Sequence, residues 1–258
     1  MISKNQIKFI RQLEQKKYRR REQLFVAEGT KVVGDLLHRY QPASLFATAE
    51  YLADHPFLYG KDYEITEITH DELQRLSFLQ HPQQVLALFP MPSFISTDNA
   101  EIASKTIEQL SIALDGVQDP GNLGTIIRIA DWFGIENIYC SEDTVDAWNP
   151  KVVQATMGSI ARVNIIYTNL LEMLDTLPAS FPVYGTLLDG ENIYEQPLSG
   201  KGLIIMGNEG NGISQAVRSR ITHRLLIPSF RQGDTAESLN VAIATAITCS
   251  EFRRRSIG

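Results

Sequence analysis

The sequence Gly207-Asn208-Glu209-Gly210-Asn211-Gly212-Ile213-Ser214 marks a loop directly after an apolar run, Lys201 to Met206. A short apolar run of this kind is typical of a buried parallel strand. The glycines favour tight turns, because they reach backbone conformations that other residues avoid. Open α/β sheets bind ligands beyond the carboxyl ends of their strands, so this loop is a candidate binding site.

Two more loops follow predicted strands in the same half of the chain. One runs from Asp115 to Gly124 and leads into a predicted helix over 123–133. The other begins at Ile227-Pro228 and ends in Ser238-Leu239-Asn240. Any one of these loops is more often a plain turn, whereas three at strand ends in one domain favour a ligand site.

The loops do not match the common cofactor motifs. Gly116 and Gly121 have the glycine spacing of a phosphate-binding G-x-x-x-x-G-K-[ST] loop, but Asn122 stands where that motif requires lysine. The second loop reads G-x-x-G-x-G rather than G-x-G-x-x-G. No G-x-S-x-G or H-E-x-x-H sequence occurs, and the five histidines are scattered, so we expect no metal. Such loops suit a neutral, hydrogen-bonding ligand such as an adenosine rather than a pyrophosphate.

The pattern along the chain predicts two α/β domains. Strands expected over 24–29, 44–49, 64–68 and 84–89, with a capping box at Thr69 to Glu72, form a first domain over 1–90. A segment rich in proline, serine and threonine predicts a linker over 91–101. The second domain, over 102–258, alternates strands and helices, which favours a parallel sheet. Its expected strands are 111–117, 137–140, 162–166, 182–188, 201–206 and 223–228, and its expected helices are 123–133, 150–157, 169–177, 214–220 and 237–254.

Charge is unevenly distributed along the 258 residues, whose net charge is −6. The first 40 residues carry ten Lys or Arg and four acidic residues, whereas the other 218 carry 14 basic and 26 acidic ones. A basic N-terminal segment on an otherwise acidic chain is expected of a protein that binds a polyanion at one end. A solvated charged helix explains this charge distribution equally well. The densest part is Lys16, Lys17, Arg19, Arg20 and Arg21, with Tyr18 among them.

Composition places the chain among ordinary globular proteins, with 43% hydrophobic and 21% charged residues. No apolar run is long enough for a transmembrane helix, and the first residues do not resemble a signal peptide. Cys140 and Cys249 have no metal-binding spacing and are expected to be buried thiols. We therefore expect a cytoplasmic protein without a membrane segment.

The three loops resemble the motifs of the SpoU/TrmH family of RNA ribose 2′-O-methyltransferases in the SPOUT superfamily. Asn122 to Arg128 is similar to the first motif, Gly207 to Ser214 to the second, and Ile227-Pro228 with Ser238 to Val241 to the third. The order and spacing match over about residues 110–250. The first 90 residues resemble the substrate-binding domain of the family, most clearly at Phe25-Val26-Ala27-Glu28-Gly29.

The resemblance implies a small N-terminal α/β substrate-binding domain and a C-terminal SPOUT methyltransferase domain with a deep trefoil knot. It implies S-adenosyl-L-methionine as cofactor and a homodimer formed through the C-terminal domain. Position by position, it implies cofactor binding by Gly207, Ile227 and Leu239, and a catalytic site containing Asn122, Arg128, Glu209, Ser238 and Asn240. Arg128 lies off the apolar stripe of its helix, and its guanidinium stays charged. It therefore suits binding a phosphate and stabilising an alkoxide better than accepting a proton; a salt bridge with Asp131 is the competing interpretation.

The third motif departs from the family pattern, because Ser229, Phe230 and Ala242 replace its usual residues and the loop is longer. We expect an S-adenosylmethionine-dependent methyltransferase acting on a ribose 2′-hydroxyl of ribosomal RNA, with Lys16, Lys17, Arg19, Arg20 and Arg21 binding the RNA. The alternatives are a tRNA 2′-O-methyltransferase, a non-catalytic RNA-binding or ribosome-assembly protein on the same scaffold, and a metabolic enzyme that binds a nucleotide on an ordinary doubly wound sheet. The missing cofactor motifs disfavour the metabolic enzyme.

Overall fold

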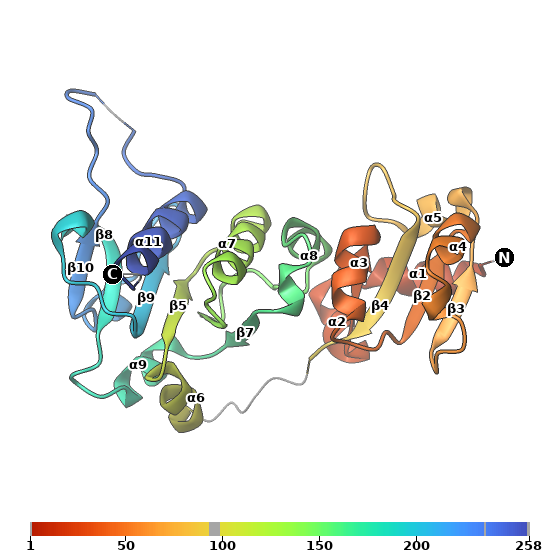
Figure 1. Cartoon of the computed structure of the whole chain (residues 1–258), viewed down its shortest axis with the longest axis horizontal. Coiled ribbons are helices and arrows are strands. Elements are labelled where there is room, and N and C mark those ends of the chain that lie inside the picture. Colours follow the sequence, from red (N-terminus) through yellow and green to blue (C-terminus); the bar gives the residue numbers. More distant parts are fainter. Residues whose placement is uncertain (1, 93–98, 235, 257–258) are drawn as a thin grey trace. The chain divides into compact units, whose positions relative to one another are not determined.

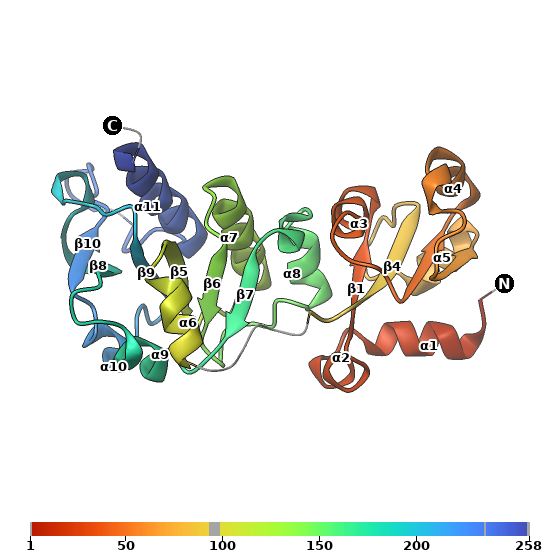
Figure 2. The ribbon, with the colours of Figure 1, turned by 60° about the horizontal axis from the view of Figure 1, so that its bottom comes forward.

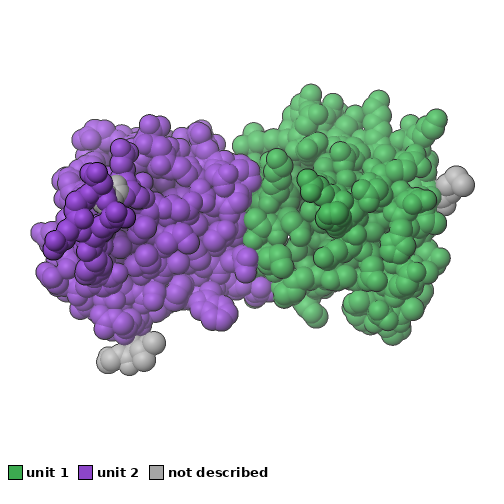
Figure 3. Space-filling view, turned by 90° about the horizontal axis from the view of Figure 1, so that it is seen from above, with its two compact units in different colours: residues 1–93, 146–161 green, residues 94–145, 162–258 purple. Residues whose placement is uncertain are grey.

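The computed structural model describes residues 2–92, 99–234 and 236–256. The chain folds into two structural units (Figure 3). Unit 1 comprises Met1–Ser93 and Asp146–Ala161, and unit 2 comprises Phe94–Val145 and Arg162–Gly258. Residues 146–161 thus group with unit 1, which the predicted bounds of 1–90 and 102–258 did not anticipate. Residues 93–98 of the predicted linker lie outside the described residues.

Unit 1 contains a four-stranded sheet with the order β1-β4-β2-β3. Figure 1 labels β4, β2 and β3, and Figure 2 labels β1 beside β4. The strands are β1 (Leu24–Glu28), β2 (Ser44–Ala47), β3 (Glu64–Glu67) and β4 (Val85–Pro90). β4 is antiparallel to both of its neighbours, whereas β2 and β3 are parallel. All four strands lie where the alternation of apolar residues predicts them.

The helices of unit 1 are α1 (Lys4–Gln12), α2 (Lys16–Glu22), α3 (Thr30–Leu37), α4 (Ala49–Asp54), α5 (His70–Leu76) and α8 (Pro150–Ala155), with 3-10 turns η1 (Pro56–Leu58) and η2 (Ser159–Ala161). The predicted capping box is present: Thr69 and Glu72 exchange side chain–backbone hydrogen bonds at the start of α5. Apolar residues of α1 and α5 form one core with Val26, Leu86 and Leu88 of the sheet. α8 packs against β1, and a helix over an edge strand protects its unpaired backbone groups.

Unit 2 contains a six-stranded parallel sheet with the order β10-β8-β9-β5-β6-β7. The strands are β5 (Leu110–Asp115), β6 (Asn137–Cys140), β7 (Asn164–Tyr167), β8 (Val183–Asn192), β9 (Gly202–Gly207) and β10 (His223–Leu226). The chain builds outward from β5 to β7 and then returns to place β9 on the other side of β5. The carboxyl ends of β5 and β9 are therefore the topological switch point, where such sheets bind ligands.

Helices cover both faces of this sheet (Figures 1 and 2). α7 (Pro120–Trp132) and α11 (Val241–Ser256) lie side by side on one face. α6 (Asn99–Thr106), α9 (Leu170–Thr176) and α10 (Gln215–Arg218) contribute to an apolar core on the other. A short 3-10 turn, η3 (Ile193–Glu195), follows β8. No helix among the described residues is both long and apolar enough to cross a bilayer.

Candidate functional site

The switch point brings the first two glycine-bearing loops together. Asp115, the last residue of β5, pairs in register with Gly207 at the end of β9. The Asn208 side chain donates a hydrogen bond to the carbonyl of Gly116 at 2.7 Å, and the Ser214 amide donates to Asp115 Oδ2 at 2.7 Å. Hydrogen bonds near both ends of the second loop, at Asn208 and Ser214, thus connect it to the first loop.

Glu209 connects the second loop to the start of α7. Its carboxylate accepts hydrogen bonds from the backbone amides of Gln118 at 3.2 Å and Asp119 at 3.1 Å, and from Asn122 Nδ2 at 3.0 Å. Burial raises the pKa of Glu209, but these hydrogen bonds favour the ionised form and outweigh burial, so the pKa lies below its ordinary value. Glu209 is therefore a carboxylate at neutral pH, and its oxygens already have partners.

Asn122 joins all three motifs. Its Nδ2 donates to Glu209 of the second motif, and its Oδ1 accepts from Asn240 Nδ2 of the third at 2.9 Å. Asn240 also accepts hydrogen bonds from the backbone amides of Ala242 and Ile243, so it caps the start of α11. The helix predicted over 237–254 therefore begins only at residue 241.

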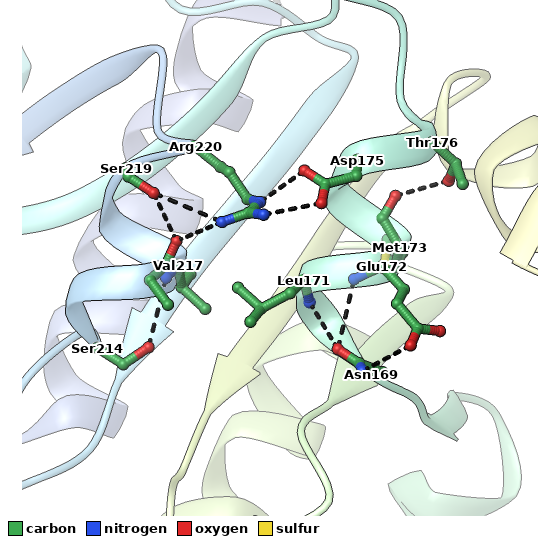
Figure 4. A network of polar contacts seen from close by, with 11 residues as sticks. Asn169, Leu171, Glu172, Met173, Asp175, Thr176, Ser214, Val217, Ser219 and Arg220 are labelled. Atoms are coloured by element: carbon green, nitrogen blue, oxygen red, sulfur yellow. Dashed lines mark hydrogen bonds and ion pairs between the residues drawn. The ribbon is translucent and has the colours of Figure 1, made fainter.

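The second loop is supported from within and from behind. Asn208 and Gly212 form an isolated antiparallel bridge across it. Ser214 ends the loop and caps α10 by accepting from the amide of Val217 (Figure 4). Just after α10, Arg220 makes a bidentate pair with Asp175 of α9 at 2.6 and 2.7 Å (Figure 4). This pair links the turn after α10 to α9.

A cavity of about 860 Å³ opens beside these loops. Its lining includes the three predicted cofactor-binding residues Gly207, Ile227 and Leu239, and also Glu209, Ser238 and Asn240. Its volume lies in the range of about 300–1,000 Å³ that is usual for small-molecule sites. A Cβ placed on Gly207 would lie 2.3 Å from backbone atoms of Gly212 and Ile213, so only glycine permits this close approach. Gly207, Gly212 and Ile213 all line the cavity, so this wall depends on their backbones packing closely against one another.

Arg128 lies on the exposed side of α7, as its position off the apolar stripe predicts. Its side chain makes no hydrogen bond or ion pair with any residue that the structure describes. The competing interpretation, a salt bridge with Asp131, is wrong: Asp131 pairs with Arg162, Nη2 to Oδ2 at 2.8 Å. Arg128 is not among the residues lining the cavity. Its charge is therefore available to a group outside this chain's own polar network.

Comparison with known proteins identifies the family. The model of the SpoU rRNA Methylase family matches residues 109–250, and that of the MRM3-like substrate binding domain matches residues 4–87. The chain belongs to the SpoU rRNA methylase family. The three motifs that meet at Asn122 all lie within the first match.

Similar proteins span nearly the whole chain. The 23S rRNA (guanosine(2553)-2′-O)-methyltransferase RlmP of Bacillus subtilis is 32% identical over 97% of each chain. A TrmH-family protein from Porphyromonas gingivalis has a solved structure with a TM-score of 0.86 and 43% identity over 99% of each chain. An AdoMet-bound rRNA methyltransferase from Sinorhizobium meliloti has a TM-score of 0.85 and 30% identity, covering 99% of this chain and 96% of its own. The predicted SpoU/TrmH family, methyltransferase class, α/β fold class and S-adenosylmethionine cofactor are confirmed.

The predicted RNA-binding cluster is wrong at one residue, Arg19. Its side chain is 2% exposed and forms an ion pair with Asp146, and its Nη1 donates to the carbonyls of Leu13 and Glu14 at 2.7 and 2.6 Å. The periodicity of α2 turns Arg19 inward, while Lys16, Lys17, Arg20 and Arg21 remain exposed. Arg19 therefore holds unit 1 together and is removed from the surface cluster.

Sequence reasoning missed three polar residues that line the large cavity: Thr186, Asp189 and Arg218. Asp189 forms ion pairs with Arg218 and with Arg224, the latter at 3.5 Å. For Thr186 and Asp189, the available signal was their place at or just after the carboxyl end of the strand predicted over 182–188, whereas Arg218 lies in the helix predicted over 214–220. Among the described residues, no group of three His, Cys, Asp or Glu is arranged to hold a metal ion.

Proposed function

We propose that this chain transfers a methyl group from S-adenosyl-L-methionine to the ribose 2′-hydroxyl of a guanosine in 23S ribosomal RNA. The observation that carries the proposal is the meeting of all three motifs at Asn122, beside the cavity that Gly207, Ile227 and Leu239 line. The B. subtilis relative is named for this substrate and position on the ribose. Ribosomal RNA rather than tRNA is supported by that relative and by the match to a substrate-binding domain.

The residues of the cavity fit the cofactor. Gly207 ends β9, Ile227 follows β10, and both line the cavity together with the apolar side chain of Leu239. Backbone groups of this kind bind an uncharged adenosine by hydrogen bonds. When bound, S-adenosylmethionine supplies a methyl group on a sulfonium, which is the electrophile for the ribose oxygen.

We assign Arg128 to binding the RNA rather than to removing the proton of the ribose 2′-hydroxyl. A guanidinium does not lose its proton in proteins, so Arg128 cannot act as a general base. Its side chain is exposed and has no partner among the residues described, so it is free to bind a phosphate. A fixed positive charge near the 2′-oxygen also stabilises the alkoxide that develops as the proton leaves.

Glu209, Asn122, Ser238 and Asn240 are assigned to organising the site. The Glu209 carboxylate already accepts three hydrogen bonds, which leaves it weakly basic. Its effect is to orient the Asn122 amide, since the same amide must donate to Glu209 and accept from Asn240. Ser238 lies between Ile227 and Asn240 on the loop that completes the cavity wall.

The surface cluster of Lys16, Lys17, Arg20 and Arg21 is proposed to bind the RNA backbone. Lys17 Nζ lies 4.8 Å and Arg21 Cζ 4.9 Å from the centre of the Tyr18 ring, so two cations are held over one aromatic side chain. Replacing Lys17 and Arg20 with alanine is expected to reduce the slope of log K against log salt by about 0.7–0.9 per lost phosphate contact. An unchanged affinity and slope would show that the cluster is only a solvated surface.

We further propose that two copies associate through unit 2. Trp132 at the end of α7 is 85% exposed and Ile243 on the neighbouring α11 is 52% exposed, which leaves apolar surface for a partner to cover. Trp132→Glu is then expected to yield a monomer in light scattering.

The trefoil knot remains a proposal supported by the return of the chain after β10 to Asn122. A cytoplasmic location also remains a prediction.

Methylation assays on defined RNAs test the function. The full chain would be incubated with tritiated S-adenosylmethionine and with 23S rRNA, 16S rRNA or tRNA transcribed in vitro, and 2′-O-methylated positions would be mapped by sequencing. We expect one guanosine of 23S rRNA to be methylated. Label in tRNA alone would contradict the substrate, and binding of RNA without label in any RNA would favour the non-catalytic alternative.

A further inference from the structure

Unit 1 contains a second cavity, of about 290 Å³, that the methyl-transfer site does not use. β1, the segment after α5 and α8 all contribute to its lining. Its walls include the apolar side chains of Val26, Phe78 and Pro150, and its polar residues are Glu28, Lys151 and Gln154. The cavity thus combines apolar walls with a few polar groups, as small-ligand sites do.

Glu28 is the one acidic residue among the described residues that line this cavity, and it is 5% exposed. One carboxylate oxygen accepts from the Ser77 hydroxyl, and the other accepts from the Phe78 amide at 2.8 Å. A carboxylate can accept about four hydrogen bonds, and no further donor to Glu28 occurs among the residues described. Burial raises the pKa of Glu28, although the hydrogen bonds from Ser77 and Phe78 and the nearby Arg11 oppose this shift.

Two neighbours add a ring and a positive charge. The Arg11 guanidinium lies 4.6 Å from the centre of the Phe78 ring and also donates to the carbonyl of Ser77, so it holds this aromatic residue in place. Lys151 is exposed, and its ammonium has no ion pair with any residue in the described ranges. The cavity therefore offers an aromatic wall, a buried acceptor pair and a surface cation.

We propose that this cavity binds one unpaired guanine of the RNA substrate, with its N1–H and N2–H groups on the Glu28 carboxylate and a neighbouring phosphate on Lys151. The proposal rests on the proposed RNA methyltransferase function. Guanine presents two adjacent donors on its Watson–Crick edge, whereas adenine, cytosine and uracil each place an acceptor beside a donor there. Proteins commonly read unpaired RNA bases in this way, by contact with an aromatic side chain and hydrogen bonds to that edge.

Changing the RNA tests the proposal without changing the protein. The full chain would be titrated with fluorescently labelled 5′-AAGAA-3′ and with versions carrying inosine, 7-deazaguanosine or adenosine at the centre. A paired contact to a base edge discriminates by about 1–3 kcal/mol, so we expect guanosine to bind at least about fivefold more tightly than adenosine. Inosine lacks the N2 amino group and should lose part of this preference, whereas 7-deazaguanosine keeps the edge and should bind like guanosine.

Variants then place the recognition in this cavity rather than at the methyl-transfer site. Glu28→Gln should abolish the preference for guanosine, and Ala155→Leu, which fills the cavity, should abolish it without touching Glu28. Lys151→Ala should weaken the binding of all four RNAs alike and reduce the slope of log K against log salt concentration by about 0.7. Lys61→Ala is the matched control, because Lys61 is an exposed lysine of the same unit outside the cavity. Thermal melting would confirm that each variant is folded.

The outcomes separate this proposal from the function on which it rests. Equal affinity for guanosine and adenosine, or a guanosine preference that survives in folded Ala155→Leu, would overturn the guanine site while leaving rRNA methylation intact. Absence of methylation in every RNA would instead refute the proposed function.

Discussion

Replacing Gly207 with alanine should damage cofactor binding more than any other single added methyl group in the second loop. The added Cβ would lie 2.3 Å from Gly212 C and Ile213 N and 2.6 Å from Gly212 O. Ordinary contacts are at least 3.4 Å, so the loop backbone would have to move by about 1 Å. The contacts are with backbone, so no side chain can rotate away, and such overpacking typically costs about 1–3 kcal/mol of stability.

A displacement of this size would reach both the cavity wall and Glu209, which holds Asn122. A misplacement of about 1 Å can reduce a rate by about 10²-fold, so methyl transfer should fall at least that far. Calorimetry with S-adenosylmethionine and single-turnover methylation measure the two effects. Gly210→Ala is the matched control, since its Cβ would meet only Asn208 Oδ1 at 3.6 Å. If Gly207→Ala binds the cofactor as tightly as Gly210→Ala, the backbone of this loop does not form the cofactor site.

Three further perturbations test individual residues. Arg128→Ala should bind S-adenosylmethionine and melt like the wild type, yet transfer methyl groups about 10²–10³-fold more slowly, with poor rescue by lysine if a bidentate contact is needed. Arg19→Ala should destabilise the protein by about 3–5 kcal/mol, measured by urea unfolding, because the Asp146 carboxylate would lose the cation with which it forms a buried ion pair. Hydrogen bonds and charge from Arg254 and Arg255 lower the pKa of Glu251 from 4.5 to about 2. A carboxyl group with a lowered pKa stabilises the fold above pH 4.5, and this stabilisation is lost as the pH falls toward 2. The melting temperatures of wild type and Glu251→Gln should therefore converge between these two pH values.

The positions of the strands along the chain and the three loops could be predicted because both depend on local patterns. Apolar runs bounded by glycine and proline predict strands, and each strand of the structure overlaps a predicted one. The place of Gly207 beside Asp115 also follows from sequence once a parallel sheet is assumed, since the ends of neighbouring parallel strands meet at one edge.

Features that depend on long-range contacts could not be predicted. The charge of Arg19 indicates an exposed side chain, and only the fold brings Asp146, 127 positions away, to pair with it. Asp189 and Arg218 likewise belong to the cavity through an ion pair between β8 and α10, which no local motif encodes. The grouping of residues 146–161 with unit 1 has the same origin, because α8 packs on β1 and Trp148 on Phe25, with ring centres 4.7 Å apart.

The position of Arg128 relative to Asn122 indicates what is needed to complete the site. Both residues lie on α7, and six residues along a helix correspond to about 9 Å along its axis and to a different face. Hydrogen bonds to Glu209 and Asn240 fix Asn122, so the rigid helix also fixes the origin of the Arg128 side chain. Among the described residues, the Arg128 side chain makes no hydrogen bond or ion pair with the polar cluster around Asn122. Its partner must come from outside this network, which supports assigning it to an RNA phosphate brought alongside α7.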